Sequence, residues 1–239
     1  MDKKELKFVL DTGVLCPILI LIACDRDKGN LISVKYFIEE ETFEKEMKKH
    51  LNNKDEIIND SLMFRFGISS FLEFLNELIE NKFFEIASLN KEMEILDLIS
   101  KNNLIYNELK NIYEKNKELF KFSGRDNNVG EFRSYLLAIL INADYFTTFD
   151  YKCCNTILEK FKVRRGISKK SRGAVFPWRV GIIGLCDYLC IVCNNNENLF
   201  ESLETLINYF EDLIDIDNNH PEILLIKELY KEYGKSLID

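Results

Sequence analysis

Short apolar runs that read as buried β-strands alternate with helical segments through the first 165 residues of the chain. Four runs carry the strand pattern: Leu6–Leu10, Leu31–Ile38, Phe83–Leu89 and Tyr145–Phe149. Between them the apolar residues recur at helical spacing, most clearly in the segment that begins at Glu131. Strands that alternate with helices predict an α/β fold of three layers, with helices on both faces of a central parallel sheet.

The C-terminal part of the chain has a different character. Three helices are expected there, near Val180–Cys193, Asn198–Ile214 and Pro221–Ser236. Only ten Gly and three Pro interrupt the 239 residues, which favours a helix-rich protein. We therefore expect an α/β domain over residues 1–165, followed over residues 166–239 by a basic linker and a C-terminal helical extension.

The cysteines and the N-terminal segment favour a cytoplasmic location. Seven Cys are an odd number for a disulfide framework, and three of them lie in the apolar run Cys186–Cys193 at helical spacing, as buried thiols do. The apolar stretch Gly13–Cys24 is too short to span a bilayer. We expect a protein of the reducing cytoplasm with no membrane segment. The alternative is an envelope lipoprotein cleaved before Cys24.

A strongly basic segment contrasts with the acidic balance of the chain. The net charge of −8 argues against a protein coated in nucleic acid. Residues 160–172 nevertheless hold seven cations and no acid: Lys160, Lys162, Arg164, Arg165, Lys169, Lys170 and Arg172. One interpretation is a solvated loop rim, since blocks of like charge usually solvate or repel. The other is a basic strip that follows the phosphates of a nucleic acid.

Acidic residues lie where two of the expected strands end. Asp11 follows one strand, Asp150 follows another, and Glu131 opens an amphipathic helix. In an open parallel sheet, ligands collect at the carboxyl ends of the strands, where the strand order switches. Carboxylates that converge there repel one another, and a divalent cation such as Mg²⁺ or Mn²⁺ removes the conflict. The other interpretation is a Rossmann-like domain whose acids are ordinary turn and cap residues.

The segments that carry these acids resemble motifs of the PIN-domain ribonuclease superfamily. FVLDTGVL (Phe8–Leu15) is similar to the first motif of the superfamily, in which a strand ends in an Asp and a helix follows. IEEETFEKEM (Ile38–Met47) is similar to the second motif, in which a strand is followed by a helix that carries an acid. VGEFRSYLLAILINADYFTTFD (Val129–Asp150) resembles the Gly-acid helix, the Ala-Asp-hydrophobic run and Thr-x-Asp. The resemblance covers about residues 5–165, with an insertion at about residues 50–68, and implies a PIN-like fold.

The resemblance also implies a catalytic site in which four acids hold the metal. These acids are Asp11, Glu46, Glu131 and Asp150. Glu44 competes with Glu46 for the second position. Thr12 and Thr148 would support the acids through hydrogen bonds to a carboxylate or to a metal-bound water. Gly13 stands where many relatives have Asn, so one side-chain amide is absent here.

The implied activity is that of a metal-dependent endoribonuclease with Mg²⁺ or Mn²⁺ as cofactor. The metal would lower the pKa of a bound water, orient it for in-line attack on an RNA phosphodiester and stabilise the leaving oxygen. The alternative is a PIN-like scaffold that binds RNA or protein without cleaving it. The resemblance also allows an inhibitory protein partner, as toxins of this superfamily have, and self-association; it leaves the role of the C-terminal helices open.

Overall fold

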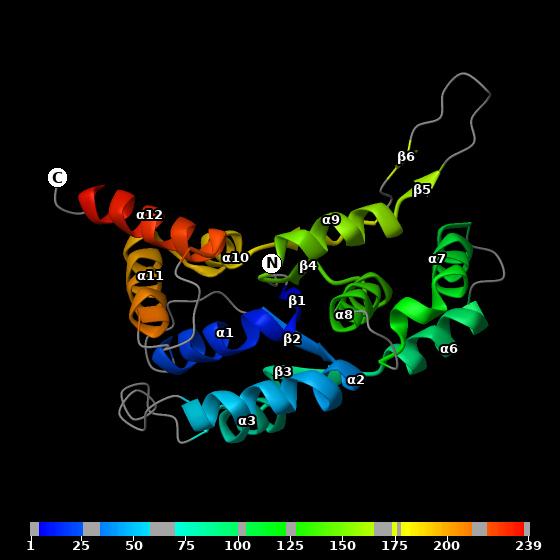
Figure 1. The fold of residues 1–239 in the computed structure, drawn as a ribbon, viewed down its shortest axis with the longest axis horizontal. Helices are drawn as coiled ribbons and strands as arrows, with labels where there is room; N and C mark the ends of the chain where they lie inside the picture. The colour runs from blue at the N-terminus through cyan, green and yellow to red at the C-terminus, as the bar shows by residue number, and fades with distance from the viewer. Residues whose placement is uncertain are drawn as a thin grey trace.

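The computed structural model of the chain describes residues 5–25, 34–57, 70–99, 104–122, 128–164, 174–175, 178–211 and 219–236. In these residues a five-stranded parallel sheet is surrounded mostly by helices, so the expected α/β class is confirmed (Figure 1). The strands lie in the order β3-β2-β1-β4-β7, with the first strand of the chain at the centre.

The sheet is built from short, largely buried strands, and four of them match the runs that the sequence predicts. The five strands are β1 (Leu6–Leu10), β2 (Val34–Glu39), β3 (Phe84–Ala87), β4 (Tyr145–Thr147) and β7 (Gly181–Ile183). Phe8 fixes the register at the centre, because it lies beside Tyr36 of β2 on one side and Tyr145 of β4 on the other. Since all neighbouring strands are parallel, their carboxyl ends lie at one edge of the sheet.

The fifth strand corrects the prediction of a single helix near Val180–Cys193. Gly181–Ile183 pair with β4 instead, and helix α10 spans only Leu185–Val192. A Cβ atom at Gly181 would lie 2.9 Å from Cδ1 of Tyr145, so the missing side chain allows this close approach to β4. The boundary expected at residue 165 therefore does not separate the sheet from the segment that follows.

Helices cover the sheet and connect its strands (Figure 1). In chain order they are α1 (Thr12–Asp25), α2 (Glu40–Thr42), the π-helical turn η1 (Phe43–Met47), α3 (Lys48–Ile57), α5 (Phe71–Glu80), α6 (Leu89–Ile99), α7 (Leu104–Lys115), the 3₁₀ turn η3 (Lys117–Phe120), α8 (Val129–Leu140), α9 (Tyr151–Lys160), α10, α11 (Asn196–Glu211) and α12 (Pro221–Ser236). β5 (Val163–Arg164) and β6 (Ala174–Val175) form a separate antiparallel pair. α3 enters the insertion expected at about residues 50–68, of which residues 58–68 lie outside the described part.

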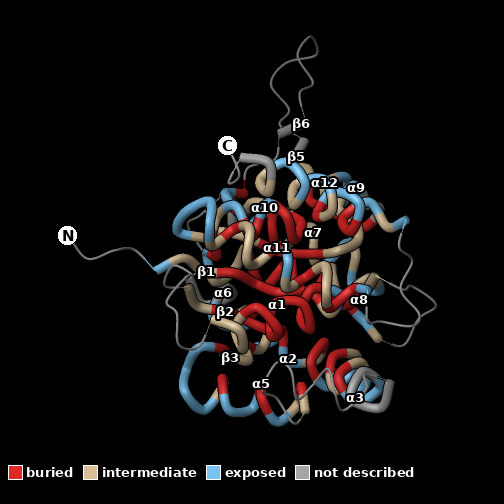
Figure 2. Tube along the Cα trace, turned by 90° about the vertical axis from the view of Figure 1, so that its left-hand side faces the viewer, coloured by how far each residue is buried: buried red, intermediate tan, exposed pale blue. Residues whose placement is uncertain are grey.

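Two hydrophobic cores lie on the two faces of the sheet, because successive strand residues point in opposite directions. Phe8 and Leu10 enter the core that is shared with α1, α5, α10, α11 and α12. Val9, between them, enters the other core, where α6, α7, α8 and α9 contribute. Buried residues run through the strands and through α1 in the middle of the molecule (Figure 2). The α/β class thus takes the form of helices on both faces of a sheet.

The C-terminal helices belong to the first of these cores. Leu199, Leu203 and Leu206 of α11 are buried in the same cluster as Leu15 and Leu19 of α1. The segment that the sequence assigns to an extension therefore supplies both an edge strand and one wall of a core. Unfolding it alone would expose α1, which is apolar over most of its length.

The structure also describes the state of the cysteines and the character of the helices. None of the seven cysteines, all of which lie in the described residues, forms a disulfide; Cys186 is buried as expected, whereas Cys190 is exposed and Cys193 is half-buried. No helix within the described ranges combines the length and the apolar character needed to cross a membrane.

We predict that Leu203→Ala lowers the free energy of unfolding by about 2–5 kcal/mol, because it removes fully buried methyl groups from the core shared with α1. Urea unfolding is followed by circular dichroism and by the fluorescence of Trp178, which lies in the other core. Both signals should shift together, and Leu224→Ala, at an exposed position of α12, should shift neither. Loss of helix signal ahead of the Trp178 signal would show that the C-terminal helices fold separately.

Candidate functional site

The strand order reverses direction between β1 and β4, and Asp11 lies at this point. β2 lies beside β1 on one side of the sheet, while β4 and β7 lie on the other, so the switch point is at the carboxyl ends of β1 and β4. Open parallel sheets bind their ligands in the crevice outside such strand ends. Asp11 comes directly after β1 and its backbone N–H donates to the carbonyl of Thr147 at 3.0 Å. The side chain is thereby held at the crevice with only 4% of the residue exposed.

Two threonines hold the Asp11 carboxylate. The backbone N–H of Thr12 donates to Oδ1 at 2.7 Å, and the hydroxyl of Thr148 donates to Oδ2 at 2.9 Å. The Thr148 oxygen also accepts the backbone N–H of Asp150 at 3.2 Å. Thr148 therefore links the first and last acids of the expected set. Asp150 in turn caps α9, where its Oδ1 accepts the N–H of Cys153 at 3.1 Å.

Glu46 reaches the same place from the π-helical turn after β2. Its Oε2 accepts the Thr12 hydroxyl at 3.3 Å, and a Cβ atom on Gly130 would lie only 2.4 Å from that oxygen. The first turn of α8 therefore contacts Glu46 at Gly130. This contact explains in steric terms why the residue before Glu131 has no side chain. Glu44 points elsewhere: it is exposed and pairs with Lys48 at 2.6 Å. Of the two competing acids, Glu46 is the one beside Asp11.

Glu131, in the first turn of α8, has a buried oxygen without a partner. Within the described part of the chain, Oε2 of Glu131 makes no hydrogen bond. A buried acceptor that loses water and gains no protein partner costs free energy. Such a group in a native fold calls for an explanation, and a bound cation is one.

The charges of neighbouring carboxylates contribute to the raised pKa values of Asp11, Glu46 and Glu131. Burial, and then the charge of Asp11, raise the pKa of Glu131 to about 8, with further contributions from Glu46 and Asp150. Burial and the charge of Asp150 raise the pKa of Asp11 to about 6, against the hydrogen bonds from Thr148 and Thr12. Burial and the charge of Asp11 also raise the pKa of Glu46. The four acids therefore share one electrostatic environment, which a divalent cation would relieve.

The donor set suits a hard cation, although the side chains do not already enclose one. In the part of the chain that the structure describes, no group of three or more His, Cys, Asp or Glu side chains is arranged so that it could hold a metal ion. Carboxylates without a counter-ion repel one another, and two of these are engaged by threonines. A cation would have to draw the four acids closer together. The nearby thiol of Cys154 stays protonated, since burial and the charge of Asp150 raise its pKa to about 11.

A buried ion pair beside the acids is a feature that sequence reasoning missed. Glu39, at the end of β2, is fully buried, and its carboxylate accepts two hydrogen bonds from Arg133 of α8, from Nε at 3.0 Å and from an Nη at 2.9 Å. Burial alone would raise the pKa of Glu39, but Arg133 holds it below its ordinary value. The pair fixes the helix that carries Glu131 against β2. Its one sequence signal is an Arg that interrupts an apolar helix.

The basic strip begins at the far end of α9 from Asp150. Ten helical residues separate the two ends, which corresponds to about 15 Å. Lys160 is exposed there, Lys162 pairs with Glu159, and Arg164 belongs to β5. The remaining cations of the strip lie outside the described residues: Arg165, Lys169, Lys170 and Arg172. In Figure 1 the β5–β6 pair stands away from β1.

Comparisons with models of protein families, with curated proteins and with solved structures found no match to this chain.

We predict that Glu131→Gln stabilises the metal-free protein at pH 8 by on the order of 1–3 kcal/mol. The ordinary pKa of 4.5 rises to about 8 on folding, so folding takes up a proton between these values and the parent protein loses stability as the pH rises through that window. Urea unfolding in EDTA at pH 5 and pH 8 measures the effect. The gain in unfolding free energy should vanish near pH 5. Glu92→Gln is the control, because it also removes an acid from the first turn of a helix, here α6. Equal pH profiles for parent and Glu131→Gln would refute the coupling.

We predict that Arg133→Met costs about 3–5 kcal/mol of unfolding free energy, because the buried Glu39 charge loses its cationic partner and keeps only the hydrogen bonds from Thr42. The double variant Glu39→Gln, Arg133→Met should recover part of the loss, since no charge is then stranded. Chemical unfolding of both variants measures the difference. A loss below about 1 kcal/mol in Arg133→Met would show that the pair does not hold α8 against β2.

Proposed function

We propose that the chain is a PIN-like, metal-dependent endoribonuclease that uses Mg²⁺ or Mn²⁺. The observation that carries the proposal is the partnerless buried oxygen of Glu131, which lies in the field of three other carboxylates at the switch point of a parallel sheet. Four acids in one crevice are costly for a fold that binds nothing there. The same four acids are oxygen ligands of the kind that Mg²⁺ and Mn²⁺ prefer.

In this proposal Asp11, Glu46, Glu131 and Asp150 hold the metal. When bound, the metal supplies an activated water and stabilises the charge on the phosphodiester and its leaving oxygen. Thr148 fixes the orientation of Asp11 and Thr12 that of Glu46, through the hydrogen bonds that their hydroxyls donate. Burial of Asp11 against the sheet excludes bulk water from one side of the crevice.

A second candidate function is a PIN-like scaffold that binds RNA without cutting it. One observation favours it: within the described residues the acids do not already form a metal-holding group. The two candidates differ in a single property, because only the nuclease requires the acids to converge on a cation.

The cytoplasm is the compartment that we propose, since none of the seven cysteines forms a disulfide, as is usual in reducing compartments. An inhibitory protein partner or self-association would be compatible with this location.

We predict that the protein cuts a single-stranded RNA in the presence of Mn²⁺ or Mg²⁺ and that EDTA stops the reaction. Asp11→Asn and Asp150→Asn should each lower the cleavage rate by at least about 100-fold, because each removes a charged ligand. Cleavage of a labelled RNA is followed by gel electrophoresis. Glu44→Gln is the matched control: it removes an acid from the same turn as Glu46, but an exposed one paired with Lys48, and should leave the rate unchanged.

Binding of the RNA without metal-dependent cleavage would favour the scaffold. Cleavage that survives both Asp variants would refute the assignment of the site.

A further inference from the structure

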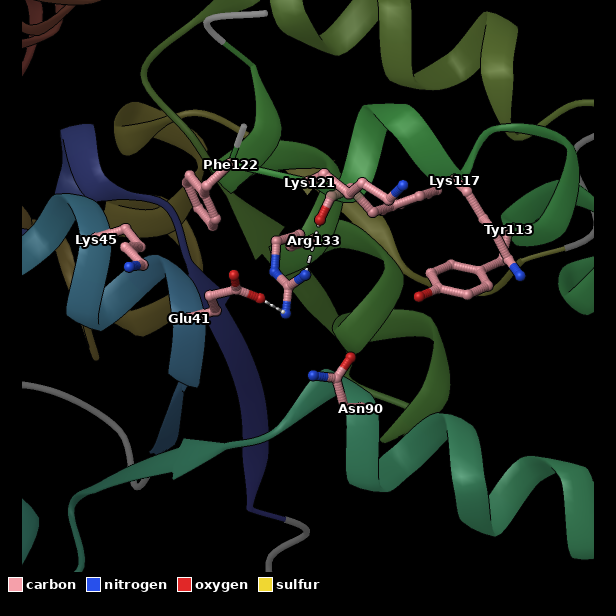
Figure 3. Close-up of a pocket in the computed structure, with 9 residues that line it drawn as sticks. Glu41, Lys45, Asn90, Tyr113, Lys117, Lys121, Phe122 and Arg133 are labelled. Carbon is pink, nitrogen blue, oxygen red and sulfur yellow. Dashed lines mark hydrogen bonds and ion pairs between the residues drawn. The ribbon is translucent and has the colours of Figure 1, made fainter. Parts of the chain in front are cut away.

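A cavity of about 790 Å³ opens beside α8, which contributes Arg133 to its lining (Figure 3). Its walls come from α2, η1, α6, α7, η3 and α8. Nine residues line it: Glu41, Lys45, Asn90, Tyr113, Lys117, Phe120, Lys121, Phe122 and Arg133. The volume is in the range of sites that hold a small ligand or one unit of a larger one.

The lining is positive, with four cations and one acid in a protein whose net charge is −8. Lys45 is exposed, and among the described residues it has no ion-pair partner. Lys117 and Lys121 pair with Glu114 and Glu118 on their own turns, at exposed positions where such pairs are weak. An incoming phosphate therefore competes easily for these ammonium groups. In Figure 3, Lys45 lies on one side of the cavity and Lys117 on the other.

Arg133 serves as the floor of the cavity and is not a free ligand. Its guanidinium donates to Glu39, pairs with Glu41 at 2.7 Å and donates to the carbonyl of Phe120 at 2.8 Å. These bonds use most of its donors, so the positive charge that remains available comes from the lysines.

Aromatic rings line the cavity together with the cations. Tyr113 packs against the buried Phe120 with ring centroids 5.0 Å apart, and both Tyr113 and Phe122 are half-buried, so each keeps part of its ring accessible. Asn90 adds an exposed amide, which can donate and accept hydrogen bonds. Lysines around aromatic rings are the combination that binds single-stranded nucleic acid, with phosphates on the cations and bases stacked on the rings.

The cavity adjoins the acids through two elements. Lys45 directly precedes Glu46 on η1, and Arg133 lies two residues after Glu131 on α8. Two residues of a helix differ by about 200° in direction, so Glu131 and Arg133 face opposite sides of the same first turns. A nucleic-acid strand that passes over this end of α8 would contact the acids on one side and the cavity on the other. By contrast, the basic strip starts a full helix away.

We infer that this cavity holds one nucleotide of a single-stranded RNA substrate, with its base stacked on Tyr113 or Phe122 and its phosphates on Lys45, Lys117 and Lys121. The identity of the strand as a substrate rests on the proposed nuclease function. The site requires a base that has left its stack, because a paired base cannot enter a cavity walled by helices. The bound nucleotide therefore comes from an unpaired stretch of the strand, a restriction that the carboxylates alone do not impose.

The test measures binding in EDTA, where the proposed reaction cannot proceed. The probe is a fluorescein-labelled ten-nucleotide adenine RNA, and the readout is fluorescence anisotropy with the full chain. Lys45→Gln should weaken binding about threefold or more at low salt and reduce the dependence on salt concentration. Tyr113→Leu and Phe122→Leu address stacking, and the more strongly affected of them should lose about fivefold or more.

Matched controls lie elsewhere on the molecule. Lys231→Gln removes an exposed lysine from α12, and Phe83→Leu removes a ring directly before β3 that is 55% exposed; neither should change the affinity. An abasic strand of the same length should bind the parent protein weakly. Its affinity for Tyr113→Leu and for Phe122→Leu should equal its affinity for the parent protein. Thermal unfolding of each variant shows that the fold is intact.

Equal affinity of the parent, Tyr113→Leu and Phe122→Leu for the adenine strand would overturn the inference, even if Lys45→Gln weakened binding, because lysines alone describe an unspecific cationic surface. Equal affinity of the parent for the strand without bases would overturn it as well. Failure of the nuclease proposal is distinguishable, since it would appear as normal, cavity-dependent binding without cleavage when Mn²⁺ is added.

Discussion

Mutual repulsion among four partly buried carboxylates is the constraint on which the rest of the structure depends. Asp11, Glu46, Glu131 and Asp150 come from four different segments of the chain, yet each is within electrostatic reach of at least one other. Bringing these carboxylates together destabilises the fold unless a positively charged group lies among them. The threonine hydroxyls offset part of the cost, but the second oxygen of Glu131 stays without a partner in the described part of the chain.

The surrounding fold keeps these acids in place. The parallel sheet brings the ends of β1 and β4 together, and Gly130 lets α8 approach η1 so that Glu131 meets Glu46. The buried pair of Glu39 and Arg133 then ties α8 to β2. The same Arg133 forms the floor of the cavity on the other side of α8. We propose that a single RNA strand contacts the acids and the basic cavity at the first turns of α8.

Much of this fold could be predicted from the sequence, because its strands and helices carry strong local patterns. Strand β7 could not be predicted, because the apolar pattern of Gly181–Ile183 continues without a break into the helix that follows. Only the pairing with β4 makes these residues a strand. The ion pair of Glu39 and Arg133 joins residues 94 positions apart and leaves no local pattern. The choice between Glu44 and Glu46 also needed coordinates, because a π-helical turn changes the direction of the residues in it.

The central claim is that the four acids converge on a divalent cation. The most direct measurement is a crystal structure grown with Mn²⁺, with anomalous scattering used to locate the metal. We expect an anomalous peak between Asp11, Glu131 and Asp150, with the carboxylates drawn closer together than in the metal-free fold. A crevice without a peak at millimolar Mn²⁺, with the Glu131 oxygen bonded to protein instead, would contradict it.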